Sequence, residues 1–315
     1  MAKEERTNME KIIEVMERHA AAVIGKIGIG FKNFKTSEEY YVNGDDRFPT
    51  ASAFKVPVLI ELYNQANQGK FSLDDMHVFK HEDISPGSGV LCYLTPGLTM
   101  CLKDYAMLMM VLSDNTGTDV LHRILGRDNI AATIERMGLK NTRADMTCRE
   151  LLFTPAKISM DTDLDEALKI FEEMDFIKDY TLISDMRVPN DISSPRDMMT
   201  MFWKIYNEEI VSPDACRQMM DIMEKCDSTR RIPLYLPKRG PREVRVIHKT
   251  GTIEYVAADC GIVITPEQTY GLTILYNGYT GDPLDKRAAY DNDEILALIS
   301  RDIYNALHKE PAAAE

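Results

Sequence analysis

Ser52 and Lys55 form a Ser-x-x-Lys pair at the start of an apolar stretch with helical patterning. A spacing of three residues puts both side chains on one face of a helix, where an amine can take the proton of a hydroxyl. A serine needs such a base because its hydroxyl is a weak nucleophile at neutral pH. The apolar run 56–60 follows, so we expect Lys55 to enter a buried helix. Taken alone, the pair has a simpler interpretation, in which Ser52 is only the N-cap of that helix.

Two tripeptides further along the chain favour catalysis. Ser113-Asp114-Asn115 follows an apolar stretch, and Lys249-Thr250-Gly251 follows a strand-like run whose last residue, His248, we interpret as a packed strand residue. Each tripeptide alone is compatible with an ordinary turn. Together and in this order, Ser-x-x-Lys, Ser-Asp-Asn and Lys-Thr-Gly are the catalytic set of class A β-lactamases and penicillin-binding proteins. The sequence therefore resembles a class A serine β-lactamase.

The resemblance implies a role for each motif residue. Ser52 would be the nucleophile that forms an acyl-enzyme, Lys55 its base, and Ser113 the group that passes a proton to the leaving nitrogen. Asp114 is expected to hold the turn. The backbone N–H groups of Ser52 and Thr252 would form the oxyanion hole. The residues expected to bind substrate are Asn115, Lys249, Thr250, Gly251 and, as a cation for a substrate carboxylate, Arg231.

The deacylating group of the family has no clear counterpart. Class A enzymes hold the hydrolytic water with a loop glutamate and an asparagine four residues later. Alignment on Thr142-Arg143 and Asp145 puts Cys148 at the glutamate position and Leu152 at the asparagine position. Glu150 takes the catalytic role only if this alignment shifts by one or two residues. We interpret Cys148 as packing rather than as a second nucleophile, because the sequence offers it no identifiable histidine partner.

The segment 153–186 intervenes before the family pattern resumes at Val188-Pro189-Asn190-Asp191. Inserted beside a site, such a segment can be a lid that reshapes substrate choice. It can equally be neutral or a dimer contact, and the sequence leaves the oligomeric state open.

Strand patterns near both ends of the chain, with helical patterns between them, predict the fold. Residues 8–24 and 291–308 are expected to be helices, and strands are expected at 26–32, 40–43, 244–249, 256–265 and 270–276. This predicts the two-lobed α/β plus α fold of the serine β-lactamases, with an antiparallel sheet covered by the N- and C-terminal helices. One lobe would comprise residues 1–45 and 235–315, and a helical lobe 46–234. The two would form one structural unit with the site in the cleft between them.

Composition excludes several other functions. A net charge of −13 argues against nucleic acid or an anionic membrane as partner, and no apolar run is long enough to span a membrane. The N-terminus lacks the apolar core of a secretory signal. Six cysteines without a CxxC pair are expected to be free thiols, which favours a cytoplasmic location unless a signal has been removed. The scattered histidines and cysteines predict no metal site, and no cofactor is implied.

The expected activity is hydrolysis of a β-lactam through an acyl-enzyme, with antibiotic resistance as a possible role and a small carbonyl compound as the partner. Two alternatives stay open. One is an amidase or esterase that acts on another small carbonyl substrate, since a fold does not determine its substrate. The other is a penicillin-binding module that is acylated without turnover, which the altered deacylation positions favour.

Overall fold

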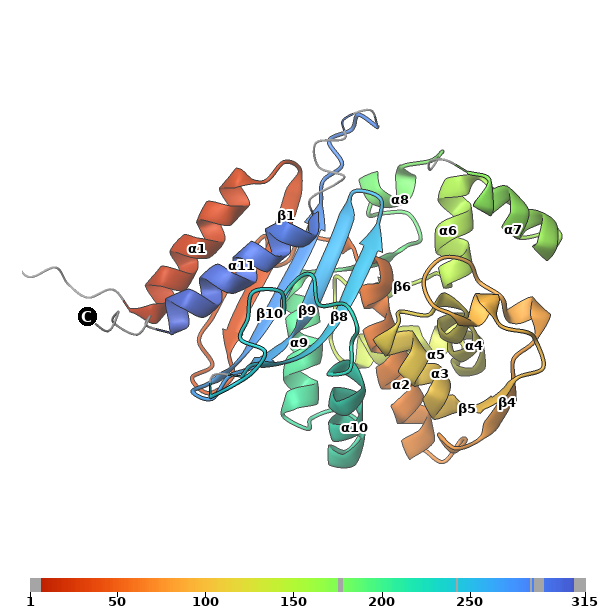
Figure 1. Cartoon of the computed structure of the whole chain (residues 1–315), viewed down its shortest axis with the longest axis horizontal. Coiled ribbons are helices and arrows are strands. Elements are labelled where there is room, and N and C mark those ends of the chain that lie inside the picture. The colour runs from red at the N-terminus through yellow and green to blue at the C-terminus, as the bar shows by residue number, and fades with distance from the viewer. Residues whose placement is uncertain (1–6, 175–177, 242, 284, 286–291, 309–315) are drawn as a thin grey trace, which may run out of the picture.

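The computed structural model of the protein describes residues 7–174, 178–241, 243–283, 285 and 292–308. Its main sheet has five antiparallel strands in the order β2-β1-β10-β9-β8. The strands are β1 (Lys26–Asn33), β2 (Glu39–Val42), β8 (Arg245–Ile253), β9 (Val256–Ile264) and β10 (Thr269–Asn277). Because β1 pairs with β10, strands from the two ends of the chain meet in one sheet, which confirms the prediction (Figure 1).

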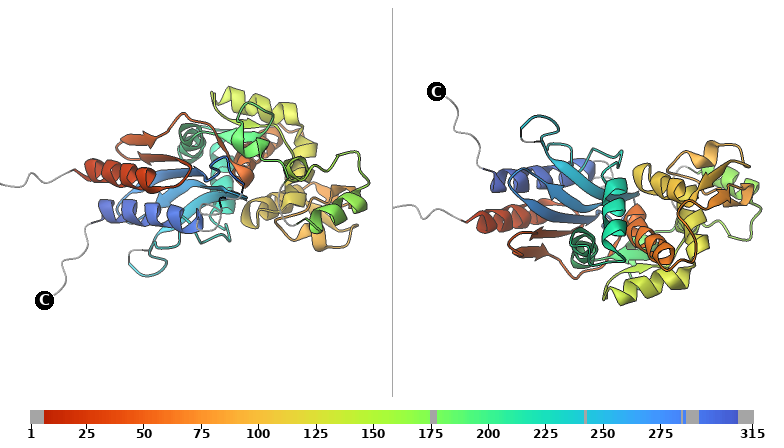
Figure 2. Two further views of the ribbon diagram at one scale, coloured as in Figure 1. Left: turned by 90° about the horizontal axis from the view of Figure 1, so that it is seen from above. Right: turned by 90° about the horizontal axis from the view of Figure 1, so that it is seen from below.

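Helices cover both faces of this sheet (Figure 2). The terminal helices α1 (Asn8–Ala22) and α11 (Asn292–Leu307) pack together on one face, as predicted, and α9 (Pro195–Tyr206) packs on the other. Alternation along β1 explains the arrangement, because Ile27, Ile29 and Phe31 join the core under the terminal helices. Gly28 faces α9 instead, where a Cβ would lie 2.6 Å from a side-chain carbon of Pro195. Glycine at this position therefore lets α9 approach the sheet closely.

Most of the remaining helices lie beyond the edge strand β8 (Figure 1). They are α2 (Lys55–Asn67), α3 (Leu102–Val111), α4 (Asn115–Leu125), α5 (Arg127–Arg136), α6 (Cys148–Ala156), α7 (Leu164–Glu172) and α8 (Thr181–Ser184), with α10 (Pro213–Met223) packed on α9 and β8. The short strands are β3 (Phe48–Pro49), β6 (Arg143–Ala144), β7 (Asp191–Ser193), β4 (Met76–Val78) and β5 (Thr99–Cys101). No helix within the described ranges is long and apolar enough to cross a membrane.

The lobe boundaries at residues 46 and 235 stay a prediction. The predicted helical segment 46–234 supplies α9, which packs on the sheet formed by the other predicted lobe. The two lobes therefore share a helix layer, which agrees with one structural unit.

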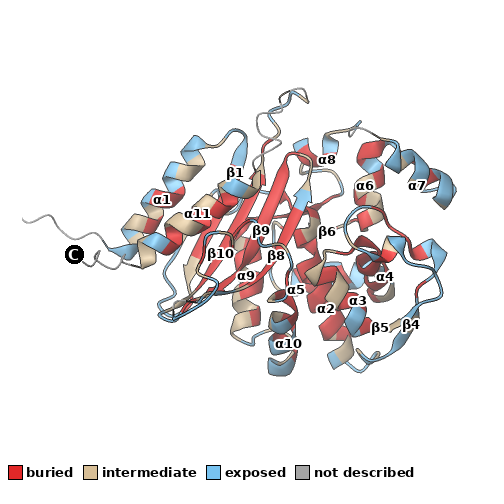
Figure 3. Cartoon of the chain, viewed as in Figure 1, coloured by how far each residue is buried: buried red, intermediate tan, exposed pale blue. Residues whose placement is uncertain are grey.

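The helix that follows Ser52 is the centre of the helical region. α2 packs against α3, α4, α5 and α10, and every residue from Lys55 to Tyr63 is buried, so the helix is covered on all sides (Figure 3). A helix that is apolar all round is a core helix. The structure thus confirms that Lys55 opens a buried helix.

The predicted insertion 153–186 contains the end of α6 together with α7 and α8. Its first part packs on itself and on α6, through Phe153, Ala156 and Ala167. Its last part reaches the sheet, where Ile183 packs with Ala51 and Tyr255. The insertion therefore lies beside the residue that precedes Ser52, and a lid role for it stays a prediction.

Candidate active site

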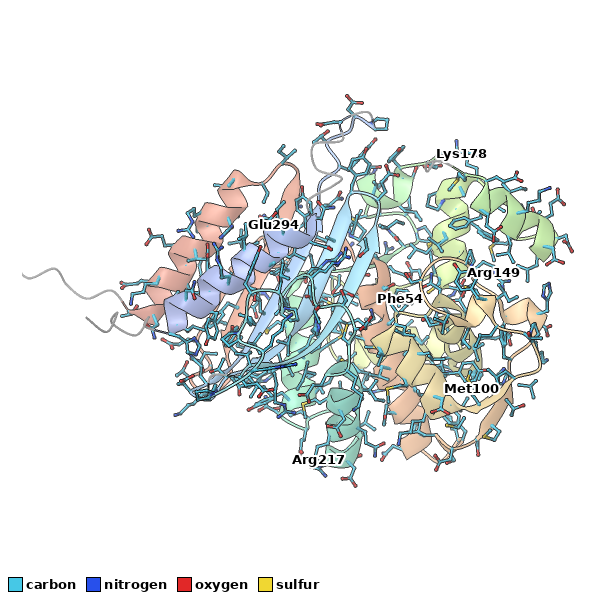
Figure 4. All side chains as sticks on the ribbon, in the orientation of Figure 1. Phe54, Met100, Arg149, Lys178, Arg217 and Glu294 are labelled. Atoms are coloured by element: carbon cyan, nitrogen blue, oxygen red, sulfur yellow. The ribbon has the colours of Figure 1, made fainter. Side chains whose placement is uncertain are left out.

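Ser52 lies in a 3-10 turn, Ala51–Phe54, that leads into α2 at Lys55. The N-cap position of α2 is Phe54, so the interpretation of Ser52 as the ordinary cap of that helix is wrong. Ala51 has a φ of 44°, a left-handed conformation that non-glycine residues rarely adopt. Strain of this kind often marks functional turns. Figure 4 labels Phe54, the last residue of this turn, which lies between the sheet and the helical region.

Lys55 is fully buried and tied to the second motif. Its Nζ donates to Ser113 O at 2.7 Å, to Ser113 Oγ at 3.2 Å and to Asn115 Oδ1 at 2.8 Å. Burial lowers the pKa of Lys55, and the charges of Asp119 and Asp114 only partly oppose this. A lysine with a lowered pKa is neutral for part of the time and can act as a base.

Lys249 reaches the same hydroxyl from β8. It is fully buried, and its Nζ donates to Ser113 Oγ at 3.0 Å and to Thr250 O at 2.8 Å. Burial first, and then the charge of Lys55, lower the pKa of Lys249 to about 7. Like charges disfavour each other's charged forms, so the two lysines titrate as a pair around one serine.

Ser113 Oγ accepts a hydrogen bond from each lysine. A hydroxyl has two lone pairs and one proton, so Ser113 keeps its O–H available to donate. The residue also has a left-handed φ of 56° at the turn between α3 and α4. This strained turn places the hydroxyl between the two amines.

The other two residues of the tripeptide hold that turn. Asp114 caps α4 by accepting the N–H of Gly117 at 2.8 Å, and its second oxygen accepts the N–H groups of Val90 at 2.6 Å and Leu91 at 2.9 Å. Asn115 uses its side-chain N–H to bond Pro86 O at 2.8 Å while its oxygen binds Lys55. The structure therefore supports the interpretation of Asp114 as a residue that holds the turn.

Gly251 brings β8 against the turn that carries Ser52. A Cβ at this position would lie 2.1 Å from Thr50 O, 2.9 Å from Ala53 N and 3.0 Å from Ser52 N. A larger residue would push the strand away from the turn, so glycine is required by close approach. The backbones of the first and third motifs are thus in contact, and an oxyanion hole made by the N–H groups of Ser52 and Thr252 stays a prediction.

Arg231 is buried directly against the end of the third motif. Its guanidinium donates at 2.7 Å to Gly251 O and to Ala258 O, and at 2.6 Å to Thr252 Oγ1. It also forms an ion pair with Asp293 at 2.7 Å. Arg231 therefore braces two strands, and a role in binding a substrate carboxylate stays a prediction.

Glu150 has a structural role at the start of α6. It forms a capping box with Thr147, whose backbone N–H it accepts at 2.7 Å. The same oxygen accepts from Arg127 at 2.6 Å. Burial raises the pKa of Glu150, but the hydrogen bonds from Arg127 and Thr147 outweigh it and hold the pKa below its usual value. This geometry favours the alignment without a shift, and catalysis by Glu150 stays a prediction.

Cys148, by contrast, lies beside Lys55. Its buried side chain lies close enough to Lys55 for each group to influence the pKa of the other, and burial raises the pKa of the thiol well above its usual value. Leu152 lies next to Asn115, since a Cβ on Gly87 would be 3.1 Å from a Leu152 methyl and 2.9 Å from the Asn115 amide nitrogen. A neutral thiol and a methyl group therefore occupy the two positions that the alignment gave to the water-binding pair.

Two acidic residues near the site were not predicted from the sequence. Asp119 accepts the N–H groups of Cys148 at 2.6 Å and Arg149 at 3.0 Å, so that it fixes the start of α6. Asp259 forms a buried pair with His248, at 2.7 Å between Oδ1 and Nδ1. Neither belongs to a motif. For Asp259 the available signal was a charged residue in the otherwise apolar run 256–264. Within the described ranges, no group of three or more metal-binding side chains is arranged to hold an ion.

Comparison with known proteins places this geometry in a family. The sequence model of the beta-lactamase enzyme family matches residues 8–307. Beta-lactamase CARB-4 of Pseudomonas aeruginosa is 29% identical over 132 residues, which are 42% of this chain and 46% of that protein. Beta-lactamase VEB-1 of the same organism is 23% identical over 103 residues, 32% of this chain and 34% of that protein. The matched region thus spans less than half the length of these curated relatives.

Solved structures share the fold over nearly the whole chain. A β-lactamase from Sphaerobacter thermophilus DSM 20745 has a TM-score of 0.75 at 24% identity, covering 96% of this chain and 98% of that one. A mutant of PBP-A, solved as an acyl-enzyme complex with penicillin G, has a TM-score of 0.73 at 25% identity, covering 98% of this chain and 100% of that one. The predicted two-lobed serine β-lactamase-like fold is confirmed.

Proposed function

This chain belongs to the beta-lactamase enzyme family, and from that premise we propose that it is a serine hydrolase which opens β-lactams through an acyl-enzyme on Ser52. The observation that supports the proposal most strongly is the arrangement of two buried lysines around one hydroxyl. Ser113 Oγ lies 3.2 Å from Lys55 Nζ and 3.0 Å from Lys249 Nζ. Such a cluster supplies both a base and a proton donor at neutral pH.

Acylation uses these groups in sequence. Ser52 Oγ attacks the lactam carbonyl carbon, and its proton passes to the neutral amine of Lys55. The carbonyl oxygen becomes negatively charged and accepts the N–H groups of Ser52 and Thr252, each donor being worth about 3–4 kcal/mol in the transition state. As the C–N bond breaks, the nitrogen takes the proton of Ser113, which is replaced from the lysine pair.

Substrate binding follows from the positive charge of the same cluster. The carboxylate of a β-lactam would be held by Lys249 and Thr250, with Arg231 behind them, while Asn115 binds an amide of the substrate. An anion beside Lys249 raises the pKa of that lysine, because opposite charges stabilise each other. Substrate binding thereby converts Lys249 to its charged form, which leaves Lys55 as the neutral base of the pair.

The proposal is tested by intact-protein mass spectrometry after mixing with benzylpenicillin, with absorbance of a chromogenic cephalosporin followed in parallel. For a hydrolase we expect turnover of the cephalosporin and a transient mass gain equal to the intact penicillin on Ser52, both lost in Ser52→Ala and both retained in the surface control Ser72→Ala. Acylation that survives Ser52→Ala would contradict the proposal. If neither an adduct nor turnover is observed, small amides and esters should be tested as substrates.

A second candidate function is acylation without turnover, as in a penicillin-binding module. The observation that favours it is the neutral thiol of Cys148 beside Lys55, with the methyl groups of Leu152 beside Asn115. Neither side chain can activate a water as a carboxylate does. The lifetime of the acyl-enzyme separates the two candidates, since a hydrolase releases its adduct within the assay and a binding module keeps it.

The expected location in a reducing compartment is also a proposal. It is supported by the six cysteines, all of which are unpaired.

A further inference from the structure

The last helix of the insertion packs against the turn that carries Ser52. Ile183, on α8, is 3% exposed and belongs to a small apolar cluster with Ala51, Tyr255 and Val256. Ala51 directly precedes Ser52, and Tyr255 lies in the turn between β8 and β9. Figure 1 shows α8 next to this end of the sheet. An apolar side chain of the insertion therefore packs on the residue beside Ser52.

Two side-chain amides hold α8 in place. Asn277, the last residue of β10, donates from Nδ2 to Ile183 O at 2.6 Å. The buried Asn190 donates from Nδ2 to Leu182 O at 2.5 Å. The last carbonyl groups of a helix lack partners within the helix, so these bonds satisfy acceptors that burial would otherwise leave unpaired. Because the two amides come from separate segments outside the insertion, α8 is part of the scaffold of the site.

An aromatic stack fixes the start of the same helix. Tyr180 directly precedes α8, and its ring stacks on that of Tyr279 with centroids 5.1 Å apart and an interplanar angle of 6°. The ring of Tyr279 meets that of Tyr255 edge-on at 5.6 Å. Aromatic pairs in such geometries stabilise a structure beyond the area they bury. The stack thus joins the start of α8 to the strand turn on which Ile183 packs.

The turn before Ser52 needs support because Ala51 has a left-handed φ of 44°. Such a conformation costs free energy and persists only where the surroundings enforce it. Asp191 O accepts both the N–H and the hydroxyl of Thr50 at 3.0 Å. Gly251 lies on another side, where a Cβ would be 2.1 Å from Thr50 O. Both contacts act on Thr50, whereas Ile183 packs against Ala51 itself.

We propose that Ile183 is a positioning residue, which holds Ala51 in its left-handed conformation and thereby keeps Ser52 in the geometry that acylation requires. Without this side chain a cavity forms beside Ala51, and the turn relaxes into it as φ returns to an ordinary value. Ser52 moves with the turn, and a small misplacement of a reacting group slows a reaction by up to about a hundredfold. This inference rests on the proposed function, because the step that it concerns is acylation of Ser52.

The proposal is tested first by comparing Ile183→Ala with Leu182→Ala. The control truncates an apolar side chain of the same helix that is also buried, at 5% exposed, but that packs with Met146 and Leu151. We expect the acylation rate constant at saturating benzylpenicillin to fall roughly tenfold in Ile183→Ala and to stay near the wild-type value in Leu182→Ala. The half-saturating concentration should not change, although both variants lose stability. Equal rate constants in the two variants would overturn the proposal.

Ala51→Gly separates positioning from a general loss of stability. Glycine adopts a positive φ without strain, so a turn with glycine at this position has no reason to relax when Ile183 is truncated. We expect Ala51→Gly/Ile183→Ala to be acylated within about twofold of the rate of Ala51→Gly alone, which a double-mutant cycle reports as coupling. Independent, additive losses would contradict the inference. If Ile183→Ala does not fold, the milder Ile183→Val takes its place in the same cycle.

Amide hydrogen exchange tests the same contact without a substrate. Within the turn, the N–H of Ala53 donates to Thr50 O at 3.1 Å. Exchange in the peptide that contains this bond should be faster in Ile183→Ala than in Leu182→Ala, because the local structure opens more often. Equal protection in the two variants would show that Ile183 does not hold the turn. An unacylated wild type would instead refute the proposed function, and the exchange comparison would still decide whether Ile183 supports Ala51.

Discussion

The two walls of the site differ in how closely they follow the family pattern. The wall formed by the Ser52 turn, the Ser113 turn and β8 carries all three motifs, and its polar side chains are joined by hydrogen bonds. The wall formed by the start of α6 presents Cys148 and Leu152 where the resemblance implies a glutamate and an asparagine. Under the proposed function, forming and hydrolysing an acyl-enzyme depend on separate parts of this molecule, and only the part that carries the three motifs matches the family pattern.

Lys55→Met should have the largest effect, because it removes the proposed base of the acylation step. We expect the rate of acylation by benzylpenicillin to fall roughly a thousandfold, because general-base catalysis contributes about that much. Mass-spectrometric time courses measure the rate, and Lys70→Met, in the exposed loop after α2, is the matched control. A loss smaller than tenfold would mean that another group takes the proton of Ser52.

Cys148→Glu tests the altered wall by supplying the missing carboxylate. We expect the acyl-enzyme to break down about a hundredfold faster, since a carboxylate at this position can activate water. The same carboxylate would raise the pKa of Lys55, so acylation should become slower. The decay of the mass adduct measures the first effect, and Cys148→Ala is the control without a carboxylate. Equal adduct lifetimes in the two variants would show that this position does not govern deacylation.

Lys249→Met tests whether the lowered pKa of Lys249 makes the folded protein less stable. The pKa of Lys249 is lowered from 10.5 to about 7, so between these pH values the unfolded chain binds a proton that the folded protein does not. The free energy of unfolding of the wild type is therefore lowered most below pH 7, and it increases as the pH rises toward 10. We expect the gain in free energy of unfolding from Lys249→Met to be largest near pH 6 and to shrink by pH 9.5, as measured by urea denaturation. A gain independent of pH would contradict a lowered pKa.

Glu150→Ala should have the smallest effect and separates the two possible alignments. Loss of the capping box and of the ion pair with Arg127 should cost roughly 1 kcal/mol of stability, seen as a lower melting temperature. The lifetime of the acyl-enzyme should not change. The exposed helical residue Glu135 provides a control, as Glu135→Ala removes a carboxylate from another helix. A lifetime extended tenfold by Glu150→Ala would restore Glu150 as the deacylating group.

Sequence patterns predicted the main strands and helices of the molecule well. The strands at both ends, the terminal helices and the buried helix after Ser52 were all found where periodicity indicated them. The 3-10 turn at Ala51–Phe54 was not predicted, because its left-handed residue is an alanine rather than a glycine. Contact with Gly251 from a distant strand holds the turn, and no local pattern records such a contact.

The identities of the motif residues and the longer helices and strands around them came from the sequence alone, because spacing and periodicity are local properties. The chemical state of those residues came from the folded arrangement. Lys55 and Lys249 reach Ser113 from positions 58 and 136 residues away, and burial by the surrounding segments is the main cause that lowers the pKa values of both amines. The buried pair of His248 and Asp259 has the same origin. Protonation depends on burial and on neighbouring charges, and both are set by segments that tertiary packing brings together.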